Sequence, residues 1–123
     1  EMEDQKTILV VDDTPENIDV LVGILKQFYK VKAAPSGEKA LKSAGKKPPD
    51  LILLDIMMPE MDGYQVLEQL KTDPVTVNIP VVFVTGMSDN ADQEKGMAMG
   101  AKGYLTKPVD PQKVLELAQK ILS

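Results

Sequence analysis

Short apolar runs alternate with segments of helical periodicity along the chain, and this alternation constrains the fold more than any other feature. Residues 8–11 and 51–54 are continuous runs of Val, Ile and Leu, without the polar alternation of a half-exposed strand. Such runs are typical of strands buried on both faces of a parallel sheet. Further strand signals lie at residues 30–34, 80–84 and 103–106, so the sequence predicts five strands.

A helix signal follows each predicted strand. We expect the second helix to be stopped by Gly45 and Pro48, and the third to end before Pro74. The fourth, over residues 89–99, is the poorest, because Gly96 interrupts it and large apolar residues are few. The first, second, third and fifth helices are expected to begin at capping residues or prolines, which are Thr14-Pro15, Ser36, Asp62 and Asp110-Pro111 in that order.

Five strand–helix units joined by right-handed crossovers build an open parallel sheet covered by helices on both faces. The sequence therefore predicts a doubly wound α/β fold. A chain of 123 residues suits one domain, which we expect to span residues 1–123. Residues 1–5 are expected to be a flexible or cloning-derived start, in which Glu1-Met2 would precede a native start near Glu3. The alternative is that Glu1 and Met2 are native sequence.

The composition excludes several function classes. The chain has no His and no Cys, which excludes disulfides, thiol chemistry and zinc or haem sites with nitrogen or sulfur ligands. All 14 basic residues are Lys and the net charge is -5, which argues against direct nucleic-acid binding. A membrane-spanning helix needs about 20 consecutive apolar residues, and no apolar run in the chain approaches that length. We expect a cytoplasmic domain whose only possible metals are hard cations held by oxygen.

Polar residues end four of the five predicted strands: Asp12 and Asp13, Asp55, Thr85 and Lys107. Because the strands are parallel, these side chains should meet at one edge of the sheet, where such folds bind ligands. Clustered carboxylates repel one another, and Mg²⁺ would relieve that repulsion while leaving room for phosphate oxygens. A carboxylate can also be a nucleophile that forms an acyl phosphate. The strand ends therefore predict a magnesium-dependent phosphoryl-acceptor site.

Each of these residues also has an ordinary structural explanation. Asp13 could be only a turn residue, Asp55 a cap or turn former, Thr85 a strand exit, and Lys107 a turn residue before Pro108. Any one position alone is a weak signal. Taken together, these residues follow four strands of one strand–helix alternation in this order, and this combination favours the functional interpretation.

Four segments carry a resemblance to a known family: "ILVVDD", "DLILLDIMMPEMDGYQ", "PVVFVTG" and "GYLTKP". Over about residues 6–122 the chain resembles the receiver domain of two-component response regulators. The resemblance implies a (βα)5 flavodoxin-like three-layer sandwich with strand order 2-1-3-4-5. It further implies that Asp55 accepts a phosphoryl group from a phosphohistidine, carried by a sensor histidine kinase or a histidine phosphotransfer protein.

The same resemblance assigns roles to residues around the acceptor. Mg²⁺, with Mn²⁺ as a possible substitute, would be held by the carboxylates of Asp12, Asp13 and Asp55 and by the backbone carbonyl of Met57. Thr85 and Lys107 would contact the phosphoryl group. Pro59 and Gly63 match the turn and helix start after the acceptor, and the Lys107-Pro108 bond is expected to be cis. Tyr104 matches an aromatic whose rotamer is coupled to Thr85; the alternative is ordinary packing at a sheet edge.

The implied function is a switch in a phosphorelay. Phosphorylation would change the face formed by the fourth helix, the fifth strand and the fifth helix, for a downstream effector domain or protein. Such a domain catalyses its own phosphorylation and dephosphorylation but is primarily a signalling switch rather than a turnover enzyme. We expect a monomer or weak dimer, because the charged dimer surface of winged-helix relatives includes Arg, which this chain lacks.

Three other classes would share parts of the pattern. A flavin carrier should have an anion-binding loop after the first strand, whereas the loop here reads "DDTPEN". A haloacid-dehalogenase-type phosphatase needs an acid at position 57, which is Met. A receiver-like module that never accepts phosphate and serves only in interactions stays open. The sequence identifies neither the kinase and signal nor the output, and it leaves open whether the receiver is free-standing.

Overall fold

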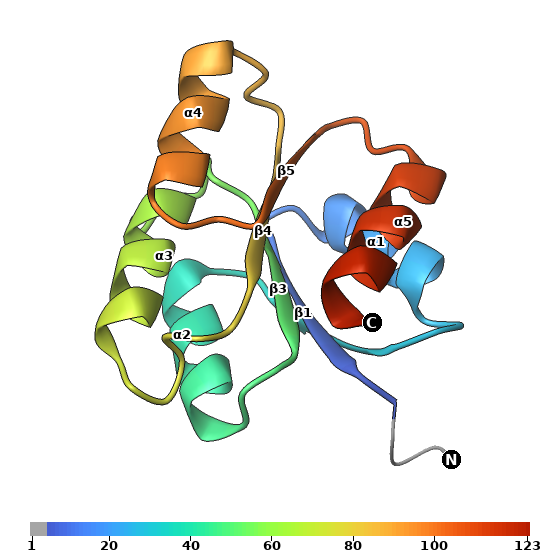
Figure 1. The fold of residues 1–123 in the computed structure, drawn as a ribbon, viewed down its shortest axis with the longest axis horizontal. Helices are drawn as coiled ribbons and strands as arrows, with labels where there is room; N and C mark the ends of the chain where they lie inside the picture. Colours follow the sequence, from blue (N-terminus) through green and yellow to red (C-terminus); the bar gives the residue numbers. More distant parts are fainter. Residues whose placement is uncertain (1–4) are drawn as a thin grey trace.

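The computed structural model describes residues 5–123, in which five strands alternate with five helices (Figure 1). The expectation for a flexible or cloning-derived start therefore lies, except for Gln5, outside the described residues. In chain order the elements are β1 (Thr7–Val11), α1 (Pro15–Leu25), β2 (Lys30–Ala34), α2 (Gly37–Lys46), β3 (Leu51–Leu54), α3 (Gly63–Thr72), β4 (Val81–Thr85), α4 (Asn90–Ala98), β5 (Gly103–Thr106) and α5 (Pro111–Leu122).

All five strands are parallel, in the order β2-β1-β3-β4-β5, which confirms the predicted sheet. The register aligns the carboxyl ends of the strands. Val11 pairs with Leu54 and Thr85 pairs with Thr106. Asp12 and Asp55, which follow the first pair, are therefore delivered side by side at the same level of the sheet.

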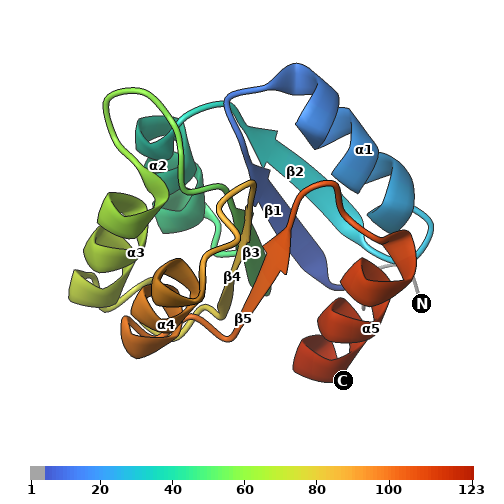
Figure 2. The ribbon, with the colours of Figure 1, turned by 90° about the horizontal axis from the view of Figure 1, so that it is seen from above.

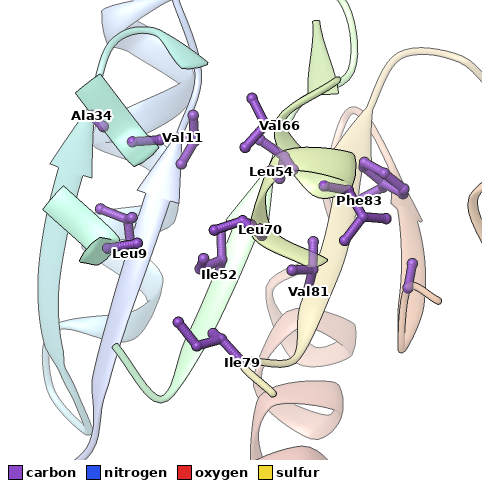
Figure 3. Packing of buried hydrophobic residues seen from close by; sticks show 14 of the residues in the cluster. Leu9, Val11, Ala34, Ile52, Leu54, Val66, Leu70, Ile79, Val81 and Phe83 are labelled. Atoms are coloured by element: carbon purple, nitrogen blue, oxygen red, sulfur yellow. The ribbon is translucent and has the colours of Figure 1, made fainter. Parts of the chain in front are cut away.

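Helices cover both faces of the sheet, giving three layers (Figure 2). On one face α2, α3 and α4 pack over a buried cluster that runs from Leu9 through Ile52 to Phe83 (Figure 3). On the other face α1 and α5 pack over Ile8, Val10 and Val82. The fully apolar strands β1 and β3 are thus buried on both sides, as their unbroken apolar sequence predicts.

The helix starts follow the predicted caps with one exception. Ser36 accepts a hydrogen bond from the Lys39 N–H, and Asp62 forms a capping box with Gln65. Thr14 is the N-cap residue of α1 and Pro15 follows it, as predicted, but the Thr14 side chain makes no capping hydrogen bond. The Asn17 N–H, which such a bond would use, donates to the Thr14 carbonyl instead.

Gly45 does not stop the second helix, contrary to the prediction, because α2 continues through it to Lys46. The space around Gly45 is open, with no heavy atom within 4 Å of the place a Cβ would take. A single exposed glycine costs a helix only about 1 kcal/mol, which the packing of Ala40 and Ala44 offsets.

The helix α4 approaches the sheet closely at a glycine. Gly96 is its only buried residue, and a Cβ there would lie 2.9 Å from Cδ2 of Phe83. Lys95 adds a cation–π contact, with its Nζ 4.1 Å from the centroid of the Tyr64 ring. The sequence predicts a poorly stabilised helix, and the structure agrees, because the face of α4 that packs on the sheet has almost no large apolar side chains.

Replacing Gly96 with alanine is expected to loosen α4, because the buried Phe83 ring cannot move away without disturbing the core. We expect amide hydrogen exchange in α4 to quicken by about tenfold, which corresponds to about 1.4 kcal/mol. Gly23→Ala in α1, where nothing lies within 4 Å, is the matched control and should leave exchange in α4 unchanged. Equal exchange in α4 for both variants would contradict this account.

Candidate phosphoryl-acceptor site

The carboxyl end of the sheet gathers three acids. Asp12, Asp13 and Asp55 each offer a carboxylate oxygen, and these oxygens lie within 4.8 Å of one another. Asp12 and Asp55 are buried, whereas Asp13 is exposed. The predicted convergence of the strand-end acids is therefore present, with one side of the cluster open to solvent.

Asp12 is held in place by both of its oxygens. Its Oδ1 accepts from the Thr14 N–H at 2.9 Å and from Nδ2 of Asn17 at 3.5 Å. Its Oδ2 accepts from Nζ of Lys107 at 2.6 Å. Sequence reasoning missed Asn17, although its position in the first turn of α1 could have indicated contact with the loop after β1.

Lys107 bridges the two buried acids. Its Nζ lies 2.6 Å from Oδ2 of Asp12 and 3.3 Å from Oδ2 of Asp55. The backbone positions it, because the Lys107 N–H donates to the Thr85 carbonyl at 2.8 Å. The following Lys107-Pro108 bond is cis, as the resemblance implies. One ammonium group thus neutralises part of the charge that burial would make costly.

Asp55 has one oxygen that the protein leaves unsatisfied. Within the described residues, its Oδ1 is buried and has no hydrogen-bond partner. Burial raises the pKa of the Asp55 carboxyl above 3.8; Lys107 opposes that rise and the neighbouring Asp12 adds to it. A buried, partnerless carboxylate oxygen beside two further acids suits a hard divalent cation, so these residues fit Mg²⁺.

The raised pKa predicts a stability effect at this position. A folded-state pKa above 3.8 means that ionised Asp55 costs stability near neutral pH, and that this cost vanishes below pH 3.8, where both states are protonated. Asp55→Asn should therefore raise the free energy of unfolding near pH 7, and the gain should shrink on acidification. Urea unfolding without divalent cations measures this, with exposed Glu68→Gln as control. A loss of stability near pH 7 would contradict the assignment.

The loop after β3 folds tightly beneath the acceptor. The Gly63 N–H donates to the Ile56 carbonyl at 2.8 Å, and the Met61 N–H donates to the Pro59 carbonyl at 2.8 Å. A Cβ on Gly63 would collide with the Asp55 carbonyl oxygen, so only glycine allows this approach. Met57 is 68% exposed, and the metal role of its carbonyl stays a prediction.

Thr85 and Tyr104 are connected through Met87. Oγ1 of the fully buried Thr85 accepts from the Met87 N–H at 3.4 Å, and the Tyr104 hydroxyl donates to the Met87 carbonyl at 2.6 Å. Tyr104 also packs edge-on against Phe83, with ring centroids 6.2 Å apart. Burial, with nearby negative groups adding to it, raises the pKa of Tyr104 to about 12. Sequence reasoning missed the backbone of Met87 as the link.

The fold and the site define the class of the protein. The strand order and helix layers are those of the CheY-like flavodoxin fold. Asp12, Asp13, Asp55 and Lys107 lie at the carboxyl ends of its strands. Residues 8–119 match the response regulator receiver domain family. The chain therefore belongs to that family, the receiver domains of two-component signalling.

Curated relatives differ in how much of their length the chain covers. It is 51% identical over 110 residues to a probable cyclic di-GMP phosphodiesterase of Vibrio cholerae, covering 88% of this chain and 25% of that protein. It is 38% identical over 117 residues to protein PilH of Pseudomonas aeruginosa, and the match covers 94% of this chain and 97% of PilH. The chain thus spans a quarter of the first relative and nearly all of the second.

Solved structures agree with the fold. A putative response regulator of Chloroflexus aurantiacus has a TM-score of 0.91 at 33% identity, with 96% of this chain and 98% of that chain covered. The BeF3-activated DrrB receiver domain has a TM-score of 0.85 at 31% identity, and the match covers 96% of this chain and 97% of that chain. Separately, no helix among residues 5–123 is both long and apolar enough to cross a bilayer.

Proposed function

We propose that the protein is a phosphorelay receiver that operates in the cytoplasm, with Asp55 as the phosphoryl acceptor. The donor would be a phosphohistidine of a sensor histidine kinase or histidine phosphotransfer protein. The observation that carries the proposal is the environment of Asp55: a buried carboxylate beside Asp12, bridged to it by Lys107, with one oxygen free of any partner among the described residues.

The chemistry follows from that environment. A carboxylate oxygen of Asp55 attacks phosphorus, the bond from phosphorus to the imidazole nitrogen breaks, and the electron pair stays on the histidine of the donor. The protein positions the carboxylate rigidly at the end of β3, so little reorganisation is needed before the attack. Lys107 lies 3.3 Å from the Asp55 oxygen, close enough to neutralise charge on the incoming group.

A divalent cation would complete the charge balance. Asp12, Asp13 and Asp55, with the Met57 carbonyl, would hold Mg²⁺ or Mn²⁺, which when bound would supply positive charge to neutralise phosphoryl oxygens in addition to Lys107. Asp12 would act twice, because the same carboxylate also orients Lys107. The exposed Asp13 would leave the site open to solvent and to a donor.

The conformational output would start at Thr85. Its hydroxyl accepts from the Met87 N–H and keeps its own proton, which it can donate to a phosphoryl oxygen. Movement of Thr85 would disturb Met87, whose carbonyl holds the Tyr104 hydroxyl, and α4 follows directly in the chain. The face of α4, β5 and α5 would change for an effector domain or protein.

Intact mass after incubation with a small phosphodonor tests the proposal. The expected result is the gain of one phosphoryl group that requires Mg²⁺ and is absent in Asp55→Asn. A wild-type protein that stays unmodified under these conditions would overturn phosphoryl acceptance. The domain would then be better described as an interaction module of receiver fold.

A further inference from the structure

Positive charge is concentrated in one part of this acidic chain. Between residues 26 and 47 every charged residue is lysine except Glu38, although the net charge of the protein is -5. Four of these lysines, Lys30 and Lys32 on β2 with Lys39 and Lys46 on α2, are here called the basic edge. Among the described residues, the salt bridges involve Lys107, and none reaches the basic edge.

The lysines of β2 project toward the layer that contains α2. Side chains alternate along a strand, so Lys30 and Lys32 share the face of Ala34. Ala34 is buried in the cluster under α2 and α3. The helix α2 packs over β2 and β1, on one face of the sheet (Figure 2). Because β2 is the edge strand, both lysines lie at the outer margin of the sheet.

The lysines of α2 lie on the matching side of that helix. Ala40 and Ala44 face the core, and Leu41 turns toward α3, where it lines a cavity with Gln69 and Thr72. Two turns separate Lys39 from Lys46, which places both on one stripe, opposite Leu41 and away from α3. That stripe is exposed to solvent, and because α2 packs on β2, it adds positive charge next to the edge that Lys30 and Lys32 occupy.

The same edge presents unpaired peptide groups. β2 pairs with β1 alone and ends the sheet. The Lys30 N–H donates to Lys6 and the Ala34 carbonyl accepts from Asp12, so residues 30, 32 and 34 bond toward β1. In a parallel pair the residues between them, Val31 and Ala33, direct their N–H and C=O groups outward. Ala33 is also small and exposed, which leaves room for another strand.

We propose that this edge is a docking site for an extended acidic segment of a partner protein, which adds to the sheet beside β2. Main-chain hydrogen bonds to Val31 and Ala33 give affinity, and carboxylates at alternate positions meet Lys30 and Lys32. Lysines on an edge strand repel a second copy of the same edge, which selects against self-pairing. The site lies apart from Asp55 and works whether or not Asp55 accepts phosphate.

A labelled peptide of alternating Glu and Thr tests the charge requirement by fluorescence anisotropy at low ionic strength. Binding to Lys30→Glu/Lys32→Glu is expected to be about tenfold weaker than to wild type. The matched control Lys113→Glu/Lys120→Glu reverses two exposed charges on α5 and should change affinity by less than about twofold. Equal weakening by both pairs would overturn the site, because it would mean attraction to overall charge.

Backbone pairing is tested separately. Ala33→Pro removes an outward N–H without removing a bond to β1, and is expected to abolish binding. Amide hydrogen exchange of Val31 and Ala33 in the wild type should slow when peptide is added, which decides the matter if the proline variant fails to fold. Unchanged exchange would overturn strand addition, as would equal binding of a peptide with the same composition in two blocks. Binding of phosphatidylserine vesicles in place of the peptide would overturn the choice of partner.

Discussion

Replacing Gly63 with alanine is expected to lower the free energy of unfolding by about 3 kcal/mol and to impair phosphoryl acceptance. The added Cβ would collide with the Asp55 carbonyl oxygen and would lie 2.8 Å from Cα of Ile56. Both contacts are backbone atoms, which cannot rotate away as a side chain can. The strand end that carries Asp55 must therefore shift, and the acceptor shifts with it.

Urea unfolding measures the first effect, and the rate of mass gain from a small phosphodonor measures the second. Gly45→Ala is the matched control, because its Cβ meets nothing within 4 Å inside α2. This control should stabilise the protein by about 0.5–1 kcal/mol and leave phosphorylation unchanged. Similar stability of the two variants would show that the loop after β3 adapts, and would refute a rigid placement of Asp55.

Lys107→Met is expected to change two properties in opposite directions. Phosphoryl acceptance should slow by about a hundredfold, because a preorganised cation 3.3 Å from the Asp55 oxygen is lost. Affinity for Mg²⁺ should rise, because the ammonium no longer competes for the charge of Asp12 and Asp55. Methionine keeps most of the side-chain volume, so packing around the site is largely retained.

The affinity for Mg²⁺ can be measured by calorimetry and the rate by intact mass. Lys113→Met, on the exposed face of α5, is the control and should alter neither. A fall in both Mg²⁺ affinity and rate would indicate that Lys107 holds the site together structurally. An unchanged rate would contradict a role of Lys107 in neutralising the phosphoryl group.

The strands and the location of the site were predictable because both depend on local sequence. Unbroken apolar runs identify β1 and β3 as strands buried on both faces, and parallel strands must bring their ends to one edge. The acids that follow those runs then had to lie together, and Asp12 and Asp55 do. Each step needed only periodicity and the direction of the strands.

The contacts within the site were not predictable in the same way. Whether Asp12 is held by Thr14 and Asn17 depends on the exact path of the loop, which tertiary packing decides. Thr14 occupies the predicted N-cap position before Pro15, but its side chain makes no capping hydrogen bond, because the Asn17 N–H donates to the Thr14 carbonyl instead. The link from Tyr104 to Thr85 passes through the backbone N–H and C=O of Met87. Every residue other than proline has these groups, so the sequence could not indicate that Met87 provides the link.

The helix α4 illustrates a different difficulty. Its sequence predicts a weak helix, and the structure explains how it docks without an apolar face: Gly96 lets it approach Phe83, and Lys95 contacts the Tyr64 ring. Both contacts join segments far apart in the chain. Periodicity could indicate that α4 is poorly anchored, but not which residues anchor it.

Reductive trapping tests the central claim, phosphoryl acceptance by Asp55, most directly. Borohydride converts an aspartyl phosphate into homoserine, so treatment after incubation with phosphodonor and Mg²⁺ marks the acceptor covalently. Peptide mass mapping then identifies the residue. The account predicts homoserine at position 55 alone, dependent on Mg²⁺. Homoserine at position 12 or 13, or none at position 55 in protein that has gained a phosphoryl group, would contradict it.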